Sequence, residues 1–209
     1  MQQTFRPPAV PLITVDPFFS VWSFADALNG DVTRHWTGEN NSIVGLVRID
    51  GLPWRFMGLE TEDRGNTLGL LPALPQTGLS ITATRSIYRF AACGIALTVQ
   101  FMAPLLPDDL DLMSRPVNYL TVTAASLDGK SHTVEVYVDI TGALCSDHLD
   151  QAEISGQTGL LAGLPGASLK NEAADSRPLA SSGDNQRINW GKAHLLSLDP
   201  AAQTGVASN

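Results

Sequence analysis

Three groups of side chains in this sequence have the residue types and spacing that chemistry needs. The first is His35 beside Trp36, which puts a titratable imidazole next to an aromatic ring. A sugar or amide site can use this combination, because the ring stacks while the imidazole makes a hydrogen bond. The commoner arrangement is a buried aromatic residue beside a hydrogen-bonded histidine. We keep the pair as candidate ligand-binding residues, with a structural role as the alternative.

The second group is an acidic cluster, Asp108, Asp109 and Asp111, followed by Arg115. Paired carboxylates can exchange protons with a substrate, and their oxygens can hold calcium. The spacing fits no calcium loop, and aspartates next to proline commonly bond their own backbone in turns. We therefore expect turns and ion pairs here, and keep Asp108, Asp109 and Arg115 as candidate binding residues only.

The third group contains the cysteines, Cys93 and Cys145, the second of them three positions before His148. A catalytic cysteine needs an activating base in contact with it, which closeness in sequence does not provide. The GxSxG pattern of a serine nucleophile is absent from the sequence. The cysteines form no CxxC pair or zinc pattern, so two independent thiols are favoured over a disulfide. No catalytic residue, metal ligand or cofactor is assigned.

The elements that position these groups are predicted to be strands. Apolar and polar residues alternate from Thr133 to Ile140 and from Ile95 to Phe101, as in a strand with one face buried and one in water. Short connections that contain glycine join such stretches into hairpins. The expected hairpins span residues 43–57 around Asp50-Gly51, residues 86–101 around 91–94, and residues 119–140 around 127–130. Many short strands without helical segments between them predict an all-β fold, an antiparallel β-sandwich with a small N-terminal β subdomain.

Composition suggests where the chain divides. Residues 61–76 are rich in Gly, Leu and Pro, which predicts a seam between a small β unit at 1–60 and a β-sandwich at 61–209. Residues 142–185 are dense in small and polar residues and predict an irregular insertion. Residues 186–190 and 193–198 predict one more strand or hairpin. The polar tail 199–209 predicts that the sandwich is incomplete at its C-terminal end.

Charge and hydropathy exclude several functions. The chain has 209 residues, a formal charge of −8 and only 13 basic residues, none of them clustered, so neither nucleic acid nor an anionic membrane is an expected partner. Prolines interrupt the N-terminal apolar residues where a signal peptide needs a continuous run, and no later stretch approaches the ~20 apolar residues of a membrane span. The cellular compartment is left unassigned.

Several segments, in order along the chain, carry a family resemblance. They are VPLITVDPFFSVWS (10–23), HWTG (35–38), LVRIDG (46–51), RFMG (55–58), LPQT (74–77), PLLPDDLDL (104–112), SRPV (114–117) and WGK (190–192). Together they resemble the opening of the glutaminase A family, densely over residues 9–140 and thinly over 186–198. The stretch 142–185 departs from the family pattern.

The resemblance implies the N-terminal β-sandwich region of a longer protein whose C-terminal part is a helical toroid, like that of several glycosidases. The family activity is hydrolysis of glutamine to glutamate and ammonia, and family members are often exported. The chain is then an accessory domain, not catalytic alone, with the toroid as its partner. A large exposed apolar patch would favour this hypothesis.

Two other hypotheses stay open from the sequence. One is a carbohydrate-binding or glycosidase-associated β-sandwich module with a small-molecule or glycan ligand. An aromatic-lined hollow on a polar surface would favour it. The other is an autonomous enzyme, which requires titratable groups clustered in a pocket.

Overall fold

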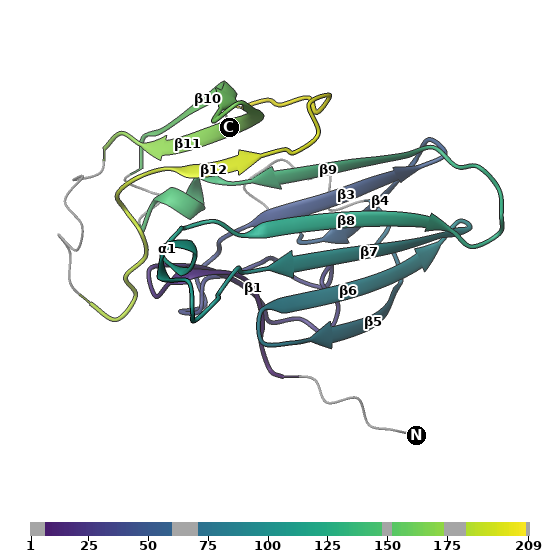
Figure 1. Cartoon of the computed structure of the whole chain (residues 1–209), viewed down its shortest axis with the longest axis horizontal. Helices are drawn as coiled ribbons and strands as arrows, with labels where there is room; N and C mark the ends of the chain where they lie inside the picture. Colours follow the sequence, from purple (N-terminus) through teal and green to yellow (C-terminus); the bar gives the residue numbers. More distant parts are fainter. Residues whose placement is uncertain (1–6, 60–70, 148–151, 174–182, 208–209) are drawn as a thin grey trace. The chain divides into compact units, whose positions relative to one another are not determined.

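A computed structural model describes residues 7–59, 71–147, 152–173 and 183–207. The chain forms two compact units, Met1–Asp139 and Ile140–Asn209. Strands dominate the described residues (Figure 1), and the short helical segments include α1 (Leu110–Met113) and η3 (Gly142–Cys145). The predicted all-β, antiparallel sandwich class is confirmed. The predicted division at residue 60 stays a prediction, because that residue falls outside the described ranges.

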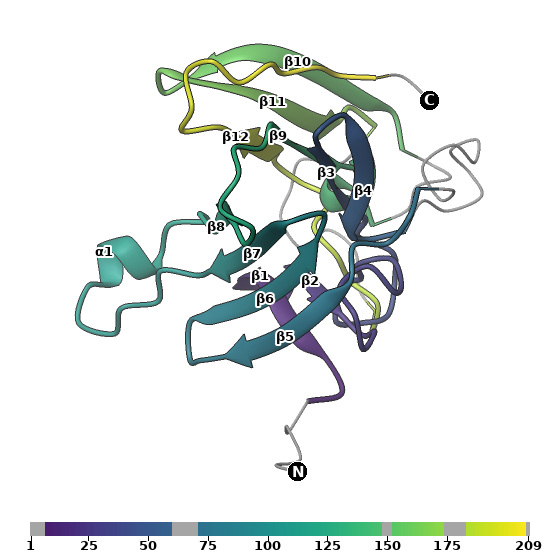
Figure 2. The same cartoon turned by 90° about the vertical axis from the view of Figure 1, so that its right-hand side faces the viewer.

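The largest sheet of the first unit is a four-stranded antiparallel meander. Its strands lie in sequence order, as Figure 2 shows. They are β5 (Gln76–Ile81), β6 (Arg85–Ala92), β7 (Ile95–Met102) and β8 (Tyr119–Ser126). Along β7 every second residue is buried, as the alternation predicts.

Two smaller sheets complete the described part of the first unit. A two-stranded ribbon joins β1 (Val10–Asp16) to β2 (Phe19–Ser23). The other sheet has the order β4-β3-β9, with β3 at Ile43–Ile49, β4 at Leu52–Met57 and β9 at Val134–Ile140.

Two predicted hairpins are confirmed, and their turns explain why. Asp50 and Gly51 between β3 and β4 have φ angles of +49° and +86°, and Cys93 and Gly94 between β6 and β7 have +50° and +76°. Positive φ at both central residues matches the twist of the flanking strands.

The third expected hairpin was wrong, because β8 and β9 belong to different sheets. β8 pairs with β7 along its whole length, from Ile95↔Ser126 to Met102↔Tyr119. β9 instead pairs with β3. The connection over residues 127–133 therefore crosses between sheets.

Aromatic side chains from the two larger sheets meet in the core of the first unit. Phe56 of β4 contacts Phe90 of β6 edge to face, with ring centroids 6.4 Å apart, and both side chains are buried. Such pairs add to the stabilisation from burial. A Cβ at Gly45 would lie 2.3 Å from the Phe56 ring, so this glycine makes room for the contact.

β9 is more exposed than its alternation predicts. Val136, expected on the buried face, is 46% exposed, and Tyr137 on the opposite face is 51% exposed. β9 is an edge strand of its sheet, and at Val136 and Tyr137 neither of its faces is buried.

The second unit corrects the prediction of an irregular insertion. Its sheet has the order β10 (Ile154–Leu161), β11 (Leu164–Asn171), β12 (Ala193–Leu196), and all pairs are antiparallel. β10 is exposed along nearly its whole length, so its residues do not alternate and no strand was predicted. Of the segments expected to give one more strand or hairpin, 193–198 contains the single strand β12, whereas 186–190 has irregular backbone.

No helix within the described ranges has the length and apolar character needed to span a bilayer.

Candidate functional site

The HWTG segment forms a rigid turn in the connection between β2 and β3. Gly38 N donates to His35 O at 2.9 Å, and Gly38 has a φ of +98°, which favours glycine. Arg34 stabilises the turn by donating hydrogen bonds to Gly38 O at 3.1 Å and to Asn40 Oδ1 at 3.0 Å. Its guanidinium also pairs with Asp31 at 3.2 Å.

His35 and Trp36 lie side by side, with ring centroids 5.6 Å apart, and both reach the carbonyl oxygen of Pro17, but they differ in burial. His35 is fully buried, with Nε2 3.1 Å from Pro17 O and Nδ1 2.9 Å from Thr37 Oγ1. Since a carbonyl only accepts, Nε2 carries the proton and Nδ1 accepts. Trp36 is 51% exposed, and its Nε1 donates to Pro17 O at 2.6 Å. Of the pair, Trp36 is the residue that presents a surface to a ligand, and its binding role stays a prediction.

The acidic candidates lie on the connection between β7 and β8. Asp109 caps α1, because its Oδ1 accepts a hydrogen bond from Leu112 N at 2.9 Å. This is the local backbone bonding expected from the sequence. Asp108, Asp111 and Arg115 are exposed. In the part of the chain that the structure describes, no ion pair joins Arg115 to these carboxylates.

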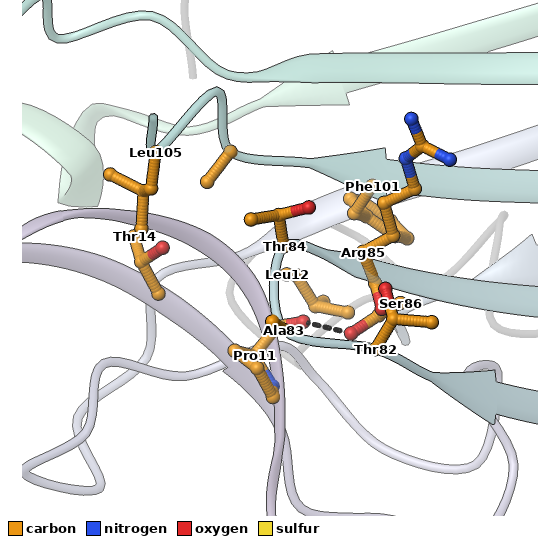
Figure 3. Close-up of a pocket in the computed structure, with 11 residues that line it drawn as sticks. Pro11, Leu12, Thr14, Thr82, Ala83, Thr84, Arg85, Ser86, Phe101 and Leu105 are labelled. Carbon is orange, nitrogen blue, oxygen red and sulfur yellow. Dashed lines mark hydrogen bonds between the residues drawn. The ribbon is translucent and has the colours of Figure 1, made fainter. Parts of the chain in front are cut away.

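A small hollow lies between β1 and the start of β6 (Figure 3), and none of the five candidate residues lines it. Its lining includes Thr14, Thr84, Ser86 and Leu105. Ser86 Oγ donates to Pro11 O at 2.7 Å, so this hydroxyl is engaged. The volume of about 40 Å³ exceeds the ~10–15 Å³ that one water molecule needs, but it is only slightly larger than the ~30 Å³ that a water occupies in the liquid. A sugar ring or a glutamine is too large for it.

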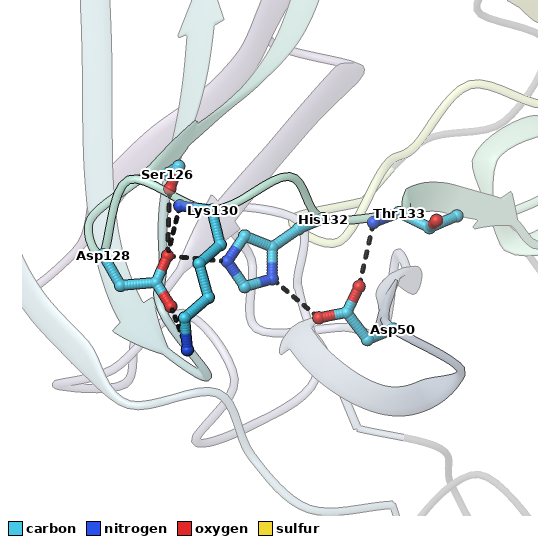
Figure 4. A network of polar contacts seen from close by, with 6 residues as sticks. All are labelled: Asp50, Ser126, Asp128, Lys130, His132 and Thr133. Carbon is cyan, nitrogen blue, oxygen red and sulfur yellow. Dashed lines mark hydrogen bonds and ion pairs between the residues drawn. The ribbon is translucent and has the colours of Figure 1, made fainter.

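Sequence reasoning missed one cluster of titratable groups among the described residues. His132 lies between two carboxylates (Figure 4), with Nδ1 2.6 Å from Asp50 Oδ2 and Nε2 2.9 Å from Asp128 Oδ1. Asp50 belongs to the β3–β4 turn, whereas Asp128 and His132 belong to the connection between β8 and β9. A Cβ at Gly94 would lie 2.8 Å from Asp128 Oδ2, so the β6–β7 turn packs there too.

Backbone and side-chain donors complete this cluster. Thr133 N donates to Asp50 Oδ1 at 2.9 Å, while Asp50 N donates to Thr133 O at 2.9 Å. Lys130 N and Ser126 Oγ donate to Asp128 Oδ1 at 3.0 and 3.1 Å. The cluster therefore joins three connections at one end of the first unit.

The surroundings of His132 favour its charged form. The hydrogen bonds to Asp128 and then to Asp50 raise its pKa above the ordinary value. In return, the hydrogen bond from His132 lowers the pKa of Asp128 to about 2 and also lowers the pKa of Asp50. With a carboxylate on each nitrogen, the imidazolium has no lone pair with which to take a proton from a substrate. Asp50, Asp128 and His132 therefore form a clamp that holds the β3–β4 turn against the connection between β8 and β9.

The cysteine group offers no activated nucleophile in the described residues. Both thiols are free, as expected from the sequence. Cys145 is buried, its Sγ lies 3.3 Å from Gly142 O, and burial raises its pKa to about 11. The thiolate is the reactive form, so burial makes Cys145 inert. His148 lies outside the described residues.

The second unit contains a serine–histidine pair that no sequence pattern pointed to. Ser168 Oγ lies 2.8 Å from His194 Nδ1, and the two residues face each other across β11 and β12. Ser168 is only 2% exposed. A nucleophile must reach its substrate, so we assign the contact to strand pairing. Asn171, also buried, donates to Asn189 Oδ1 at 2.9 Å and fixes the end of β11 in the same way.

Comparison with known proteins confirms the resemblance predicted from the sequence. Residues 84–208 match the model of a domain of unknown function, DUF5127, and residues 1–63 match that of another, DUF4964. The chain is similar to glutaminase A from Aspergillus oryzae (strain ATCC 42149 / RIB 40), with 31% identity over 149 residues. The similar region covers 68% of this chain and 20% of that protein, so the chain spans about a fifth of its relative. No solved structure matches the chain.

Proposed function

Because the chain belongs to the DUF5127 family of domains of unknown function, we propose that it is the N-terminal accessory domain of a glutaminase A-like hydrolase. The domain is not catalytic alone. The rest of such a polypeptide, which we expect to be a helical toroid, carries the hydrolysis of glutamine to glutamate and ammonia.

The observation that carries this proposal is the coverage of the match. The similar region takes up 68% of this chain but only 20% of glutaminase A, so most of that protein has no counterpart here. Resemblance over such a region transfers architecture more safely than chemistry.

The chemistry of the described residues supports an accessory role. The imidazole of His132 has a carboxylate on both nitrogens. The one serine hydroxyl described above beside an imidazole, that of Ser168, is buried. The hollow beside β1 is too small for a glutamine. His132 and Ser168 therefore have structural roles in this proposal.

Ammonia release from glutamine tests the proposal. The 209-residue chain is assayed alone and together with A. oryzae glutaminase A from which the similar region has been deleted. We expect no ammonia from the chain alone. Release from the chain alone, at a rate that scales with its concentration, would refute the accessory role and return attention to the titratable clusters.

A glycan-binding module is the second candidate, and Trp36 is the observation in its favour. Its ring is 51% exposed, yet the bond from Nε1 to Pro17 O holds it in place. A fixed aromatic face can stack on a sugar with little loss of side-chain entropy. Titration calorimetry with cello-, xylo- and chito-oligosaccharides tests this candidate. Binding that Trp36→Ala loses would support it, and an absence of heat with every glycan would exclude these ligands.

A further inference from the structure

The connection between β7 and β8 is far longer than the strands require. β7 ends at Met102 and β8 begins at Tyr119, yet these two residues are paired directly. Adjacent antiparallel strands need a loop of only ~2–5 residues. Residues 103–118 therefore form an excursion, with α1 at its centre, that projects from the sheet in Figure 2. We call residues 105–119 the α1 surface.

Large apolar side chains gather on the α1 surface and face solvent. Leu110 is 68% exposed and Leu106 is 51% exposed, while α1 itself has no buried residue. The other exposed apolar members are Leu105, Met113, Val117 and Tyr119. Single exposed leucines are ordinary, but several large exposed apolar side chains within one short segment favour an interaction site.

Local hydrogen bonds, rather than burial, hold this surface in shape. Leu112 N donates to the side chain of Asp109, and Met113 N donates to the carbonyl of Asp109, both at 2.9 Å. At the other end Ser114 N donates to Leu110 O at 2.9 Å, and Ser114 Oγ donates to Asp111 O at 3.1 Å. The apolar side chains are thus presented in a defined arrangement, which lowers the entropy cost of binding.

The charges around the apolar side chains narrow the choice of partner. Asp108, Asp109 and Asp111 are exposed within the same surface, with Arg115 as its single basic residue. A two-fold dimer would bring identical acidic patches together. Anionic lipid would be repelled by the same carboxylates. An apolar surface rimmed by Lys or Arg fits both the leucines and the aspartates.

We infer that the α1 surface is where this domain docks onto the part of a glutaminase A-like polypeptide that the chain does not match. This inference rests on the proposed function and adds the location of the contact. The missing part amounts to most of the relative, since the similar region is 20% of it. The docking region on that part is expected to be an apolar hollow with a basic rim.

A co-purification experiment tests the location. The probe is A. oryzae glutaminase A lacking its similar region, co-expressed with the tagged 209-residue chain. The similar region of A. oryzae itself, supplied as a separate tagged chain, first establishes that the probe can be captured. The test variant is Leu110→Asp/Met113→Asp. The matched control is Leu160→Asp/Leu198→Asp, which adds the same charge at two leucines that are 74% and 75% exposed.

We expect the wild-type chain and the control to capture equal amounts of probe, and the test variant to capture about tenfold less, as when charges enter the centre of an interface. Equal capture by the test variant would overturn the α1 surface as docking site while leaving the accessory role intact. No capture by the wild-type chain, although the A. oryzae region captures the probe, would instead overturn the proposed function.

Two further measurements keep the outcome decisive. Light scattering of the chain alone should give a monomer; a dimer that the test variant abolishes would assign the surface to a second copy and overturn the inference. If the test variant loses its circular dichroism spectrum, Asp108→Arg/Asp111→Arg replaces it. That variant keeps the cap at Asp109 and should also weaken capture, because it reverses the acidic rim.

Discussion

The imidazole of His132 and the carboxylate of Asp50 lie 2.6 Å apart, although 82 positions separate them in the chain. The second nitrogen of His132 binds Asp128 at 2.9 Å. One side chain therefore ties the β3–β4 turn to the connection between β8 and β9.

The clamp predicts how stability depends on pH. The pKa of His132 is raised, so its contribution is complete below the unfolded value near 6.5 and is lost as pH rises through the folded pKa. The carboxylate pKa values are lowered, so their contribution is present above about 3.8 and is lost as pH falls, for Asp128 through about 2. We expect His132→Gln to destabilise the chain most between about pH 4 and 6.5. Urea unfolding across pH measures this, with His194→Gln as control; a pH-independent loss would contradict the clamp.

Gly45→Ala should destabilise the first unit. The new Cβ would overlap the buried Phe56 ring at 2.3 Å, and overpacking of this kind costs about 2 kcal/mol. Gly78→Ala in β5 is the matched control, since nothing lies within 4 Å of its Cβ position. Urea unfolding of the two variants compares them. Equal stabilities would show that the Phe56 ring moves aside.

Asn29 should be sensitive to small changes, because it satisfies two backbone carbonyls from a buried position. Its Nδ2 donates to Arg55 O at 3.0 Å and to Leu74 O at 2.8 Å. Asn29→Ala removes both donors and should cost on the order of 2 kcal/mol. Asn29→Asp should cost more, because it turns a carboxylate toward two carbonyls. Thermal unfolding ranks the variants, and the reverse order would contradict this geometry.

The two thiols should differ sharply in reactivity. Cys93 is exposed, whereas Cys145 is buried with a pKa of about 11. At pH 8, a thiol reagent should label one cysteine in the folded chain and two in urea. Cys93→Ser should abolish the labelling of the folded chain. Rapid labelling of that variant would mean that the segment around Cys145 opens readily.

The strands of the first unit were largely predictable, because alternation and turn chemistry agree there. Asp50-Gly51 predicted a tight turn, and the structure has one in which both φ angles are positive. In the second unit the turn between β10 and β11 uses Ala162-Gly163, with φ of +51° and +81°. Alanine there gives no turn signal, and the exposed residues of β10 show no alternation. For these two reasons the sequence did not predict the hairpin of β10 and β11.

The candidate site was predicted less well than the fold. His35 and Trp36, singled out as a pair, are ring neighbours, but burial separates what each can contact, and a binding role for either stays a prediction. His132 was overlooked because its partner Asp50 becomes a neighbour only when β9 pairs with β3. Asp128, four positions before His132 in an expected turn, was the one local hint. Contacts between distant turns depend on strand order, which local patterns do not specify.

The pairing of β9 with β3 also bears on how the first unit forms. β5 to β8 are successive neighbours and can pair through contacts that are local in sequence. Pairing of β9 with β3 instead closes a loop that extends from Ile49 to Val134. Closing so long a loop is slow and comes after the local contacts. Bonds made at that late step, such as Asp50 to His132, govern how fast the native chain opens more than how fast it folds. We therefore expect the contacts of His132 with Asp50 and Asp128 to slow unfolding, so that their loss shows chiefly in a faster unfolding rate.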